Sequence, residues 1–286
     1  YQTVFDGKQS ILLDKWPQYQ ELLVNEEIEE SFDIMKDVVS ISSAARMKGK
    51  LKRRWPLNEA QICVKKNQKT KLESLSDLLK SQLNVEKFNI IETEQENDLE
   101  QLLELKELGL PVKSTLELER KKIGPKVKQH MGKLVNIFSE TNPDEIISAL
   151  QKDGKYDFKI DDEIISLDKE DFIVNFDANE NFAVAKRDEF VVFISTLRNK
   201  EMMAKGLIKD VARRLQTLRK ERGFSPTDVL ERASILDLDQ ESLEMIEVKS
   251  KELAFLVRVK QVNFIESCKE YKDDDIDGQK IRISVE

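Results

Sequence analysis

The chain has 286 residues, of which 40% are hydrophobic and 36% are charged, and its net charge is −8 at pH 7. That length allows two domains, and only 9 glycines and 6 prolines argue against a loop-dominated or low-complexity protein. No apolar run approaches the roughly 18 residues that a membrane span needs, and no signal peptide opens the sequence, so we expect no membrane partner.

The two cysteines, Cys63 and Cys268, lie far apart and have no neighbours at metal-ligand spacing. This usage excludes a disulfide framework and indicates a reducing, cytoplasmic setting. The sequence begins without Met, and we expect it to be a piece of a longer protein.

The first predicted element is a helix over residues 18–54, whose apolar residues recur at helical spacing. The stripe comprises Ile28, Phe32, Met35, Val39 and Ser42, flanked by Val38 and Ala45. Pro56 ends this helix, because the residue before a proline is driven toward extended geometry. Trp55 then lies at the break, where it is either a packed hinge residue or an exposed stacking platform.

Strands and helices are predicted to alternate from residue 57 onward, which indicates a mixed α/β fold. The expected strands are 60–64, 86–92, 114–119, 155–160, 163–167, 172–176, 190–196, 232–238 and 256–264, with more in the tail. The expected helices are 71–83, 124–138, 142–151, 200–223 and 240–252, and the acidic run 94–107 is a helix or a loop. Asn142 and Pro143 suit a helix start, and Gly223 suits a helix end.

Three short segments concentrate positive charge in this acidic chain. Residues 46–54 carry six bases and no acid, residues 121–133 carry five lysines and no acid, and residues 205–222 carry seven bases against two acids. Together they favour a polyanionic partner, nucleic acid above all. The alternative, that each segment is an ordinary solvated helix face, stays open.

Helical geometry sorts these bases onto faces. If the first helix continues to residue 54, Arg46, Lys50, Arg53 and Arg54 fall within about 100° of its circumference, while Lys48 and Lys52 point elsewhere. The 200–223 helix opposes an apolar face to a basic band about 80° wide that contains no acid. The apolar face is Met203, Leu207, Val211, Leu215 and Leu218, and the band is Lys205, Lys209, Arg213, Gln216 and Lys220.

Catalytic signatures are absent from the sequence. His130 is its single histidine, which leaves no His pair for a metal or a nucleotide. There is no glycine-rich phosphate loop or dinucleotide motif, and no nucleophile beside a base. The residues alone therefore indicate an α/β binding module for RNA, without an active site, metal or cofactor of its own.

Two longer motifs resemble a known family. ARMKGKLKRRWPL, residues 45–57, is similar to the signature that closes the anticodon-binding helical bundle of class I isoleucyl-tRNA synthetases. LIKDVARRLQTLRKERGFSPTD, residues 207–228, resembles the C-terminal module of these enzymes, with Asp210 where Glu is usual.

Shorter segments fit the same family. SILLDKWP, residues 10–17, resembles the turn between bundle helices but departs from it at Leu12 and Lys15. GPK at 124–126 and the strand at 170–176 suit the intervening region. Order and spacing match the form that archaeal and eukaryotic-type enzymes carry.

The resemblance implies the C-terminal region of an isoleucine–tRNA ligase that lacks the catalytic and editing domains. Such a parent activates isoleucine with ATP and Mg²⁺ and transfers it to its tRNA, whereas this chain alone should be inactive and need no cofactor. Residues 1–56 would end the helical anticodon-binding domain, 57–198 would form an α/β domain, and 199–286 a C-terminal α/β subdomain. We expect a cytoplasmic monomer that binds isoleucine-specific tRNA and the missing domains of its own parent.

The predicted tRNA contacts come from all three basic segments. They are Arg46, Lys50, Arg53, Arg54, Trp55, Lys126, Lys205, Lys209, Arg213 and Lys220. Two other functions stay open, namely a structural or protein-interaction module that braces the enzyme, and a free-standing RNA-binding protein derived from a synthetase.

Overall fold

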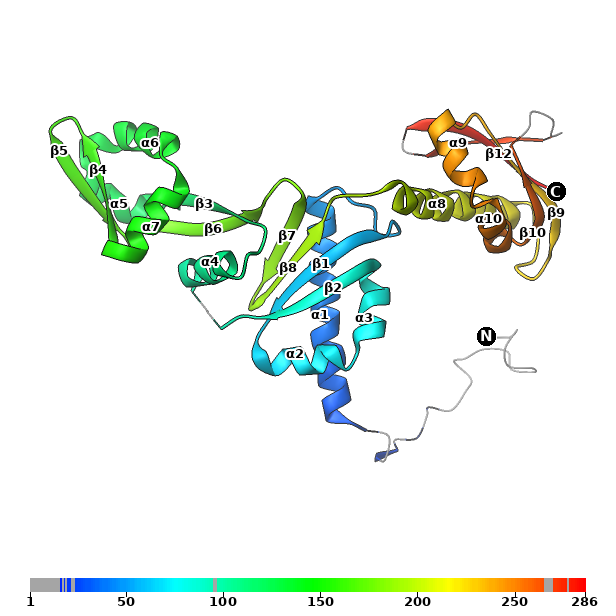
Figure 1. Cartoon of the computed structure of the whole chain (residues 1–286), viewed down its shortest axis with the longest axis horizontal. Helices are drawn as coiled ribbons and strands as arrows, with labels where there is room; N and C mark the ends of the chain where they lie inside the picture. The colour runs from blue at the N-terminus through cyan, green and yellow to red at the C-terminus, as the bar shows by residue number, and fades with distance from the viewer. Residues whose placement is uncertain are drawn as a thin grey trace.

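The computed structural model describes residues 16, 18, 20–21, 24–94, 97–264, 270–276 and 278–286. Its elements form three parts along the longest axis of the molecule (Figure 1). A four-stranded sheet with α1 (Glu26–Lys48) lies in the middle, and a part with two small sheets lies on one side. On the other side lies α8 (Lys200–Glu221) with a second four-stranded sheet. The prediction of a mixed α/β fold is confirmed.

The central sheet has the order β2–β1–β8–β7. β1 (Leu57–Val64) pairs in parallel with β2 (Val85–Glu92) and antiparallel with β8 (Phe190–Ser195), and β7 (Phe182–Arg187) pairs with the far side of β8. Two short helices, α2 (Lys66–Glu73) and α3 (Ser76–Leu83), connect β1 to β2. Parallel neighbours require such a crossover, and the predicted strand–helix–strand order is confirmed here, although the single helix predicted over 71–83 is instead two helices.

Strand β8 is buried at every position because both faces of the sheet are covered. On one face, Val192 and Ile194 pack with residues of α1. On the other, Val191 and Phe193 pack with Leu105 of α4 (Asp98–Glu107). The helix before residue 56 therefore shares a core with the sheet that follows it, and the domain division at residues 56 and 198 stays a prediction.

Helix α1 is shorter than the predicted span of 18–54. It begins at Glu26, where Asn25 accepts a hydrogen bond from the Ile28 amide at 3.1 Å, and it ends at Lys48 before Gly49. The last six residues of the first basic segment are consequently loop rather than helix. That changes the direction of every basic side chain placed by continuing the helix.

The predicted apolar stripe of α1 is only partly correct. Met35 is buried, but Ile28 is 52% exposed and Phe32 is 37% exposed. The face that packs on β7 and β8 is centred on Val38 and Ala45 instead, together with Ile34 and Ile41. The pattern of apolar residues marks which side chains can be buried, whereas the position of the sheet decides which of them are.

Residues 98–178 form a part with its own core. Its strands are β3 (Val112–Leu118) paired with β6 (Phe172–Ala178), and the hairpin of β4 (Lys155–Ile160) and β5 (Glu163–Asp168). Its helices are α4, α5 (Arg120–Val127), α6 (Met131–Glu140) and α7 (Pro143–Asp153). The single helix predicted over 124–138 is wrong, because the chain breaks at Lys128, whose φ is 48°. Helix α7 begins as predicted, with Asn142 as its N-cap and Pro143 in its first turn.

The third part consists of α8 and a sheet of order β10–β9–β12–β11. The strands are β9 (Leu230–Leu236), β10 (Val259–Asn263), β11 (Lys272–Ile276) and β12 (Gln279–Val285). Gly223 follows the end of α8 with a φ of 80°, as expected for a helix stop. The helix predicted over 240–252 is instead two, α9 (Gln240–Glu247) and α10 (Ser250–Val257).

Candidate nucleic-acid interface

Asp210 of α8 joins two of the three basic segments. Its carboxylate accepts a hydrogen bond from Lys52 Nζ at 2.9 Å and another from the Trp55 indole Nε1 at 2.9 Å. Arg54 Nη1 lies 3.6 Å from its second oxygen. The loop after α1 is thereby fixed to the middle of α8, from which it is separated by more than 150 residues of sequence.

Ionisation of Asp210 is favoured by these partners. Burial is the largest single influence and disfavours the charged form, but the hydrogen bonds from Lys52 and Trp55 and the charges of Lys52 and Arg214 together outweigh it. The pKa of Asp210 therefore lies below its usual range. The carboxylate stays charged at neutral pH and holds the cations around it.

Arg46 holds the loop after α1 through hydrogen bonds to backbone carbonyls. Its side chain is buried, and its guanidinium donates to four backbone carbonyls. These are the carbonyls of Lys52 at 3.1 Å, Trp55 at 3.0 Å, Leu83 at 2.7 Å and Asn84 at 3.1 Å. Burial first, and then the charges of Arg53 and Arg198, lower the pKa of Arg46 to about 10. Arg46 is still a cation at neutral pH, but its donors are used inside the protein.

Trp55 packs against α8 at Gly206, the single glycine of that helix. A Cβ at Gly206 would come within 2.4 Å of Trp55 Cδ2. The indole is 7% exposed, and Lys52 Nζ and Arg198 Cζ lie 5.3 Å and 5.1 Å from its ring centre. Both cations lie at cation–π distance from the electron-rich ring, which attracts them. They also add positive charge to this junction.

A hollow of about 420 Å³ opens where the loop meets α8. Its lining consists of Lys52, Arg53, Arg54, Asp210, Arg213 and Arg214. Five cations thus surround one carboxylate that is itself largely buried. Guanidinium groups present several fixed donors that match a phosphate, so the hollow suits the backbone of a nucleic acid.

The predicted contact residues fall into different groups in the structure. Arg53, Arg54 and Arg213 line the hollow. Lys50, Lys209 and Lys220 are exposed outside it. Lys205 is engaged by two carboxylates, at 3.0 Å from Glu86 and 3.1 Å from Glu201.

Two predicted contacts are wrong as surface residues. Arg46 and Trp55 are 4% and 7% exposed, and their polar hydrogens are donated to protein atoms. They position the loop instead of presenting donors or a free ring. Lys52, which helical geometry directed away from the others, lines the hollow because the helix ends at Lys48.

The sequence reasoning also missed Arg214 and Asp210 as members of this site. Asp210 is one of only two acids in the 205–222 segment, and that isolation is the signal that marks it. Arg214 carries no such signal, because its role depends on the distant strand β11.

The basic segment at residues 121–133 does not join the hollow. Lys126 binds Asp171 at 2.5 Å and Asp168 at 2.9 Å, beside β5 of the outer part, which comprises residues 98–178. Lys133 likewise binds Asp161 at 2.5 Å. Lys122 also lies 3.5 Å from Glu170, so acids of the same part balance three of the segment's lysines, and the segment is a weaker candidate for RNA than the other two.

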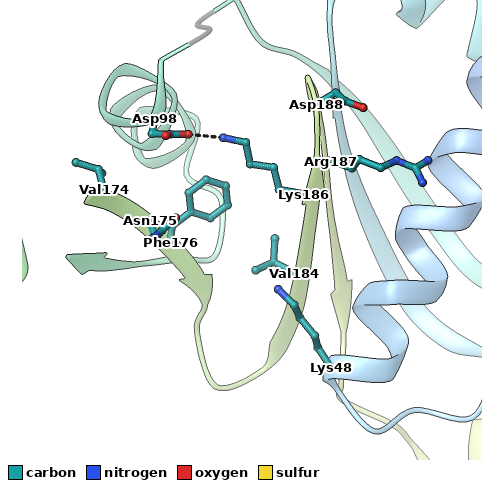
Figure 2. A pocket seen from close by; sticks show the side chains of 9 residues that line it. All are labelled: Lys48, Asp98, Val174, Asn175, Phe176, Val184, Lys186, Arg187 and Asp188. Atoms are coloured by element: carbon teal, nitrogen blue, oxygen red, sulfur yellow. Dashed lines mark hydrogen bonds and ion pairs between the residues drawn. The ribbon is translucent and has the colours of Figure 1, made fainter. Parts of the chain in front are cut away.

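Another hollow, of about 400 Å³, lies between the end of α1, β7 and the outer part (Figure 2). Lys48 reaches into it from α1, and Lys186 Nζ binds Asp98 of α4 at 2.6 Å. Arg187 on the next position of β7 is bound to Asp37 at 2.7 Å. Because its charges are mixed and Asp98, Lys186 and Arg187 are paired, this hollow is less suited to a polyanion than the one around Asp210.

Some sequence-based inferences lie outside the described residues. Of the motif at 10–17 only Trp16 is described, and Cys268 is not. Cys63 is a buried free thiol, and burial, followed by the charge of Glu104, raises its pKa to about 12. Within the described ranges, no three His, Cys, Asp or Glu side chains are grouped to hold a metal, and no helix is long and apolar enough to cross a membrane.

The helix that leads into the basic hollow lies in a segment that resembles a known family. Residues 1–62, which contain α1 and the loop that ends in Trp55, match the family model described as the anticodon-binding domain of tRNA ligase. The expected resemblance to the anticodon-binding bundle of tRNA ligases is confirmed.

The particular relatives are isoleucine–tRNA ligases. The chain is 28% identical to that of Clostridium kluyveri over 97% of its own length and 25% of the relative. It is 24% identical to that of Methanopyrus kandleri over 100% of its length and 25% of the relative, and 26% identical to that of Sulfolobus acidocaldarius over 78% and 20%. Relatives occur in archaea and bacteria, and the chain spans about a quarter of the length of those it matches most fully.

Proposed function

We propose that this chain is the anticodon-side, tRNA-binding region of an isoleucine–tRNA ligase. It holds the phosphate backbone of the RNA at the hollow around Asp210. The observation that carries the proposal is the convergence of the two most basic segments on that carboxylate. The similarity of nearly the whole chain to isoleucine–tRNA ligases supports the choice of tRNA over other RNA.

The charge of the hollow decides what it can bind. Each phosphate neutralised by Lys or Arg releases condensed counterions, which makes binding fall steeply with salt. Arg53, Arg54 and Arg213 are exposed and line one concave surface, so a single stretch of backbone can meet all three. Asp210 offsets only one of the five positive charges that line the hollow.

The test is the salt dependence of tRNA binding by the 286-residue chain. Replacement of Arg53, Arg54 and Arg213 by Ala should flatten the slope of log affinity against log salt by about two to three units, at roughly 0.7–0.9 per phosphate. The matched control replaces Lys113, Lys152 and Lys159, three exposed lysines of the outer part, and removes the same charge. Equal slopes in the two triple variants would show that only net charge matters and that the hollow is no binding site.

A second candidate is supported by the same contacts. The loop, Trp55, Gly206 and Asp210 fix α8 to the central sheet, so this region braces the third part whether or not RNA binds. Bracing alone predicts that variants of exposed Arg53 and Arg213 leave tRNA affinity unchanged. The tRNA titration therefore separates the two candidates.

The activity of the parent belongs to this proposal as well. The whole ligase would activate isoleucine with ATP and Mg²⁺ in the cytoplasm, through catalytic and editing domains that partner this region within one chain. No residue of this chain is assigned to ATP or Mg²⁺, and the chain alone acts as an inactive monomer. Isoleucine-dependent ATP–pyrophosphate exchange that persists as the chain is purified would contradict this assignment.

A further inference from the structure

Phe255 is an exposed aromatic side chain on the third part of the molecule. It lies on α10 and is 82% exposed, although Leu253 and Val257 on the same helix are fully buried. A single exposed hydrophobic residue is common on protein surfaces and by itself indicates nothing. The residues around the Phe255 ring are what distinguish it.

The end of α10 is held against the basic band of α8. Gln216, a member of that band, donates from Nε2 to the Leu256 carbonyl at 2.7 Å. Arg219 is 2% exposed and donates from Nη1 to the Arg258 carbonyl at 2.9 Å. The residues on both sides of Gln216 in the band, Arg213 and Lys220, are exposed. The backbone beside Phe255 is thus fixed to a residue of α8 that lies between two exposed cations of the band, Arg213 and Lys220.

The surface of α10 around the ring is also basic. Lys251 precedes Phe255 by four residues, a spacing that places side chains on one side of a helix, and Arg258 follows the last residue of α10 with a φ of 57°. Both are exposed, and Arg258 is held by the Pro226 carbonyl at 3.1 Å. The acid of this helix, Glu252, is bound to Lys249 at 3.2 Å. An exposed ring among cations matches single-stranded nucleic acid, whose bases offer π-faces and whose phosphates offer charge.

We propose that Phe255 is a stacking platform for an unpaired base of the bound RNA, whose phosphates follow the α8 band from the hollow. The proposal rests on the RNA-binding function above and adds that this site recognises unpaired RNA rather than a duplex. Gln216, which binds the Leu256 carbonyl beside Phe255, follows Arg213 of the hollow by three residues, or about 4.5 Å along the axis of α8. A duplex keeps its bases stacked inside and offers no such face to a single ring.

The experiment compares three substitutions of Phe255 in the 286-residue chain, with tRNA, a single-stranded oligouridine and a blunt RNA duplex as ligands. Phe255→Ala should weaken binding of tRNA and oligouridine on the order of 5- to 100-fold, since stacking on an aromatic ring contributes that much per base. Phe255→Leu should lose as much, because it keeps apolar area but no ring, while Phe255→Trp should bind like the parent chain. Duplex affinity should not change. Val248→Ala is the control, since Val248 is 87% exposed and apolar but not aromatic.

Three outcomes would overturn the proposal, and they differ from one another. If Phe255→Leu binds as well as the parent chain while Phe255→Ala does not, the site is an apolar contact of the kind a protein partner makes. If all Phe255 variants bind normally while the Arg53, Arg54 and Arg213 triple variant is weakened, the stacking site is wrong and the RNA-binding function stands. If the unaltered chain binds none of the three RNAs, the function and the stacking site fail together.

Discussion

The indole nitrogen of Trp55 donates a hydrogen bond to the carboxylate of Asp210 at 2.9 Å, across 155 residues of chain. Gly206 lies one helical turn before Asp210, so the ring packs closely against the helix near the point where its nitrogen reaches the carboxylate. One aromatic residue thereby fixes the direction of α8 relative to the central sheet. The stability of this contact and the charge of the hollow beside it can be tested separately.

Gly206→Ala should destabilise the protein by about 1–3 kcal/mol, because a methyl group there would overlap the Trp55 ring and force it to move. Alanine is otherwise the better helix former, so local propensity predicts the opposite sign. Gly132→Ala in α6 is the matched control: nothing lies within 4 Å of its added Cβ, and it should stabilise by about 0.4–1 kcal/mol. Urea unfolding of both variants measures the difference. A stabilised Gly206→Ala would mean that the close packing is absent in solution.

Asp210→Asn should lower the free energy of unfolding by about 1–3 kcal/mol at neutral pH, because the hydrogen bond from Lys52 loses its charged acceptor. RNA affinity should not fall, since the hollow becomes more positive. Loss of both stability and affinity would indicate that Asp210 positions the RNA contacts as well as the helix.

The same carboxylate predicts a pH dependence of stability. The pKa of Asp210 is lower in the folded protein than in the unfolded chain, so its contribution is present above the unfolded value of about 3.9 and is lost as pH falls through the folded pKa. The difference in unfolding free energy between the parent chain and Asp210→Asn should therefore shrink below about pH 4. A difference that stays constant down to acid pH would show that Asp210 has the same pKa folded and unfolded.

Arg46→Lys should destabilise strongly, by about 2–4 kcal/mol, because one ammonium cannot reach four carbonyls and leaves buried acceptors without donors. Arg53→Lys keeps the same charge a few residues away on the exposed loop and should change stability by less than about 0.5 kcal/mol. Thermal unfolding compares the two at equal net charge. Similar melting temperatures would place Arg46 on the surface after all.

Arg213 and Arg214 are neighbours on α8 with different expected roles. Arg214 donates from Nε to the Asp275 carbonyl at 2.8 Å and to Asp274 at 3.2 Å, so Arg214→Glu should destabilise the docking of β11. Arg213 is exposed, and Arg213→Glu should weaken tRNA binding with little change in melting temperature. Equal effects of the two variants on both measurements would mean that the faces of α8 are assigned wrongly.

Much of the local structure could be predicted because it depends on neighbours in sequence. The start of α7 at Asn142 and Pro143 and the end of α8 at Gly223 follow from capping preferences. The errors occurred where the chain had more than one local solution. The helix over 124–138 was predicted whole, but a positive φ at Lys128 divides it, and the first helix was extended through residues that form a loop.

The sequence by itself determined the composition of the site: two dense basic segments, an aromatic residue before a proline, and motifs that resemble the tRNA ligases. It could not decide which of those side chains face solvent, since Arg46 and Arg53 have the same chemistry and differ only in what surrounds them. Burial of Arg46 depends on carbonyls at the end of α3, and that of Trp55 on a glycine 151 residues later. Only the tertiary structure brings those distant groups together, because a long-range contact is set by how whole elements pack and leaves no periodic trace in the chain.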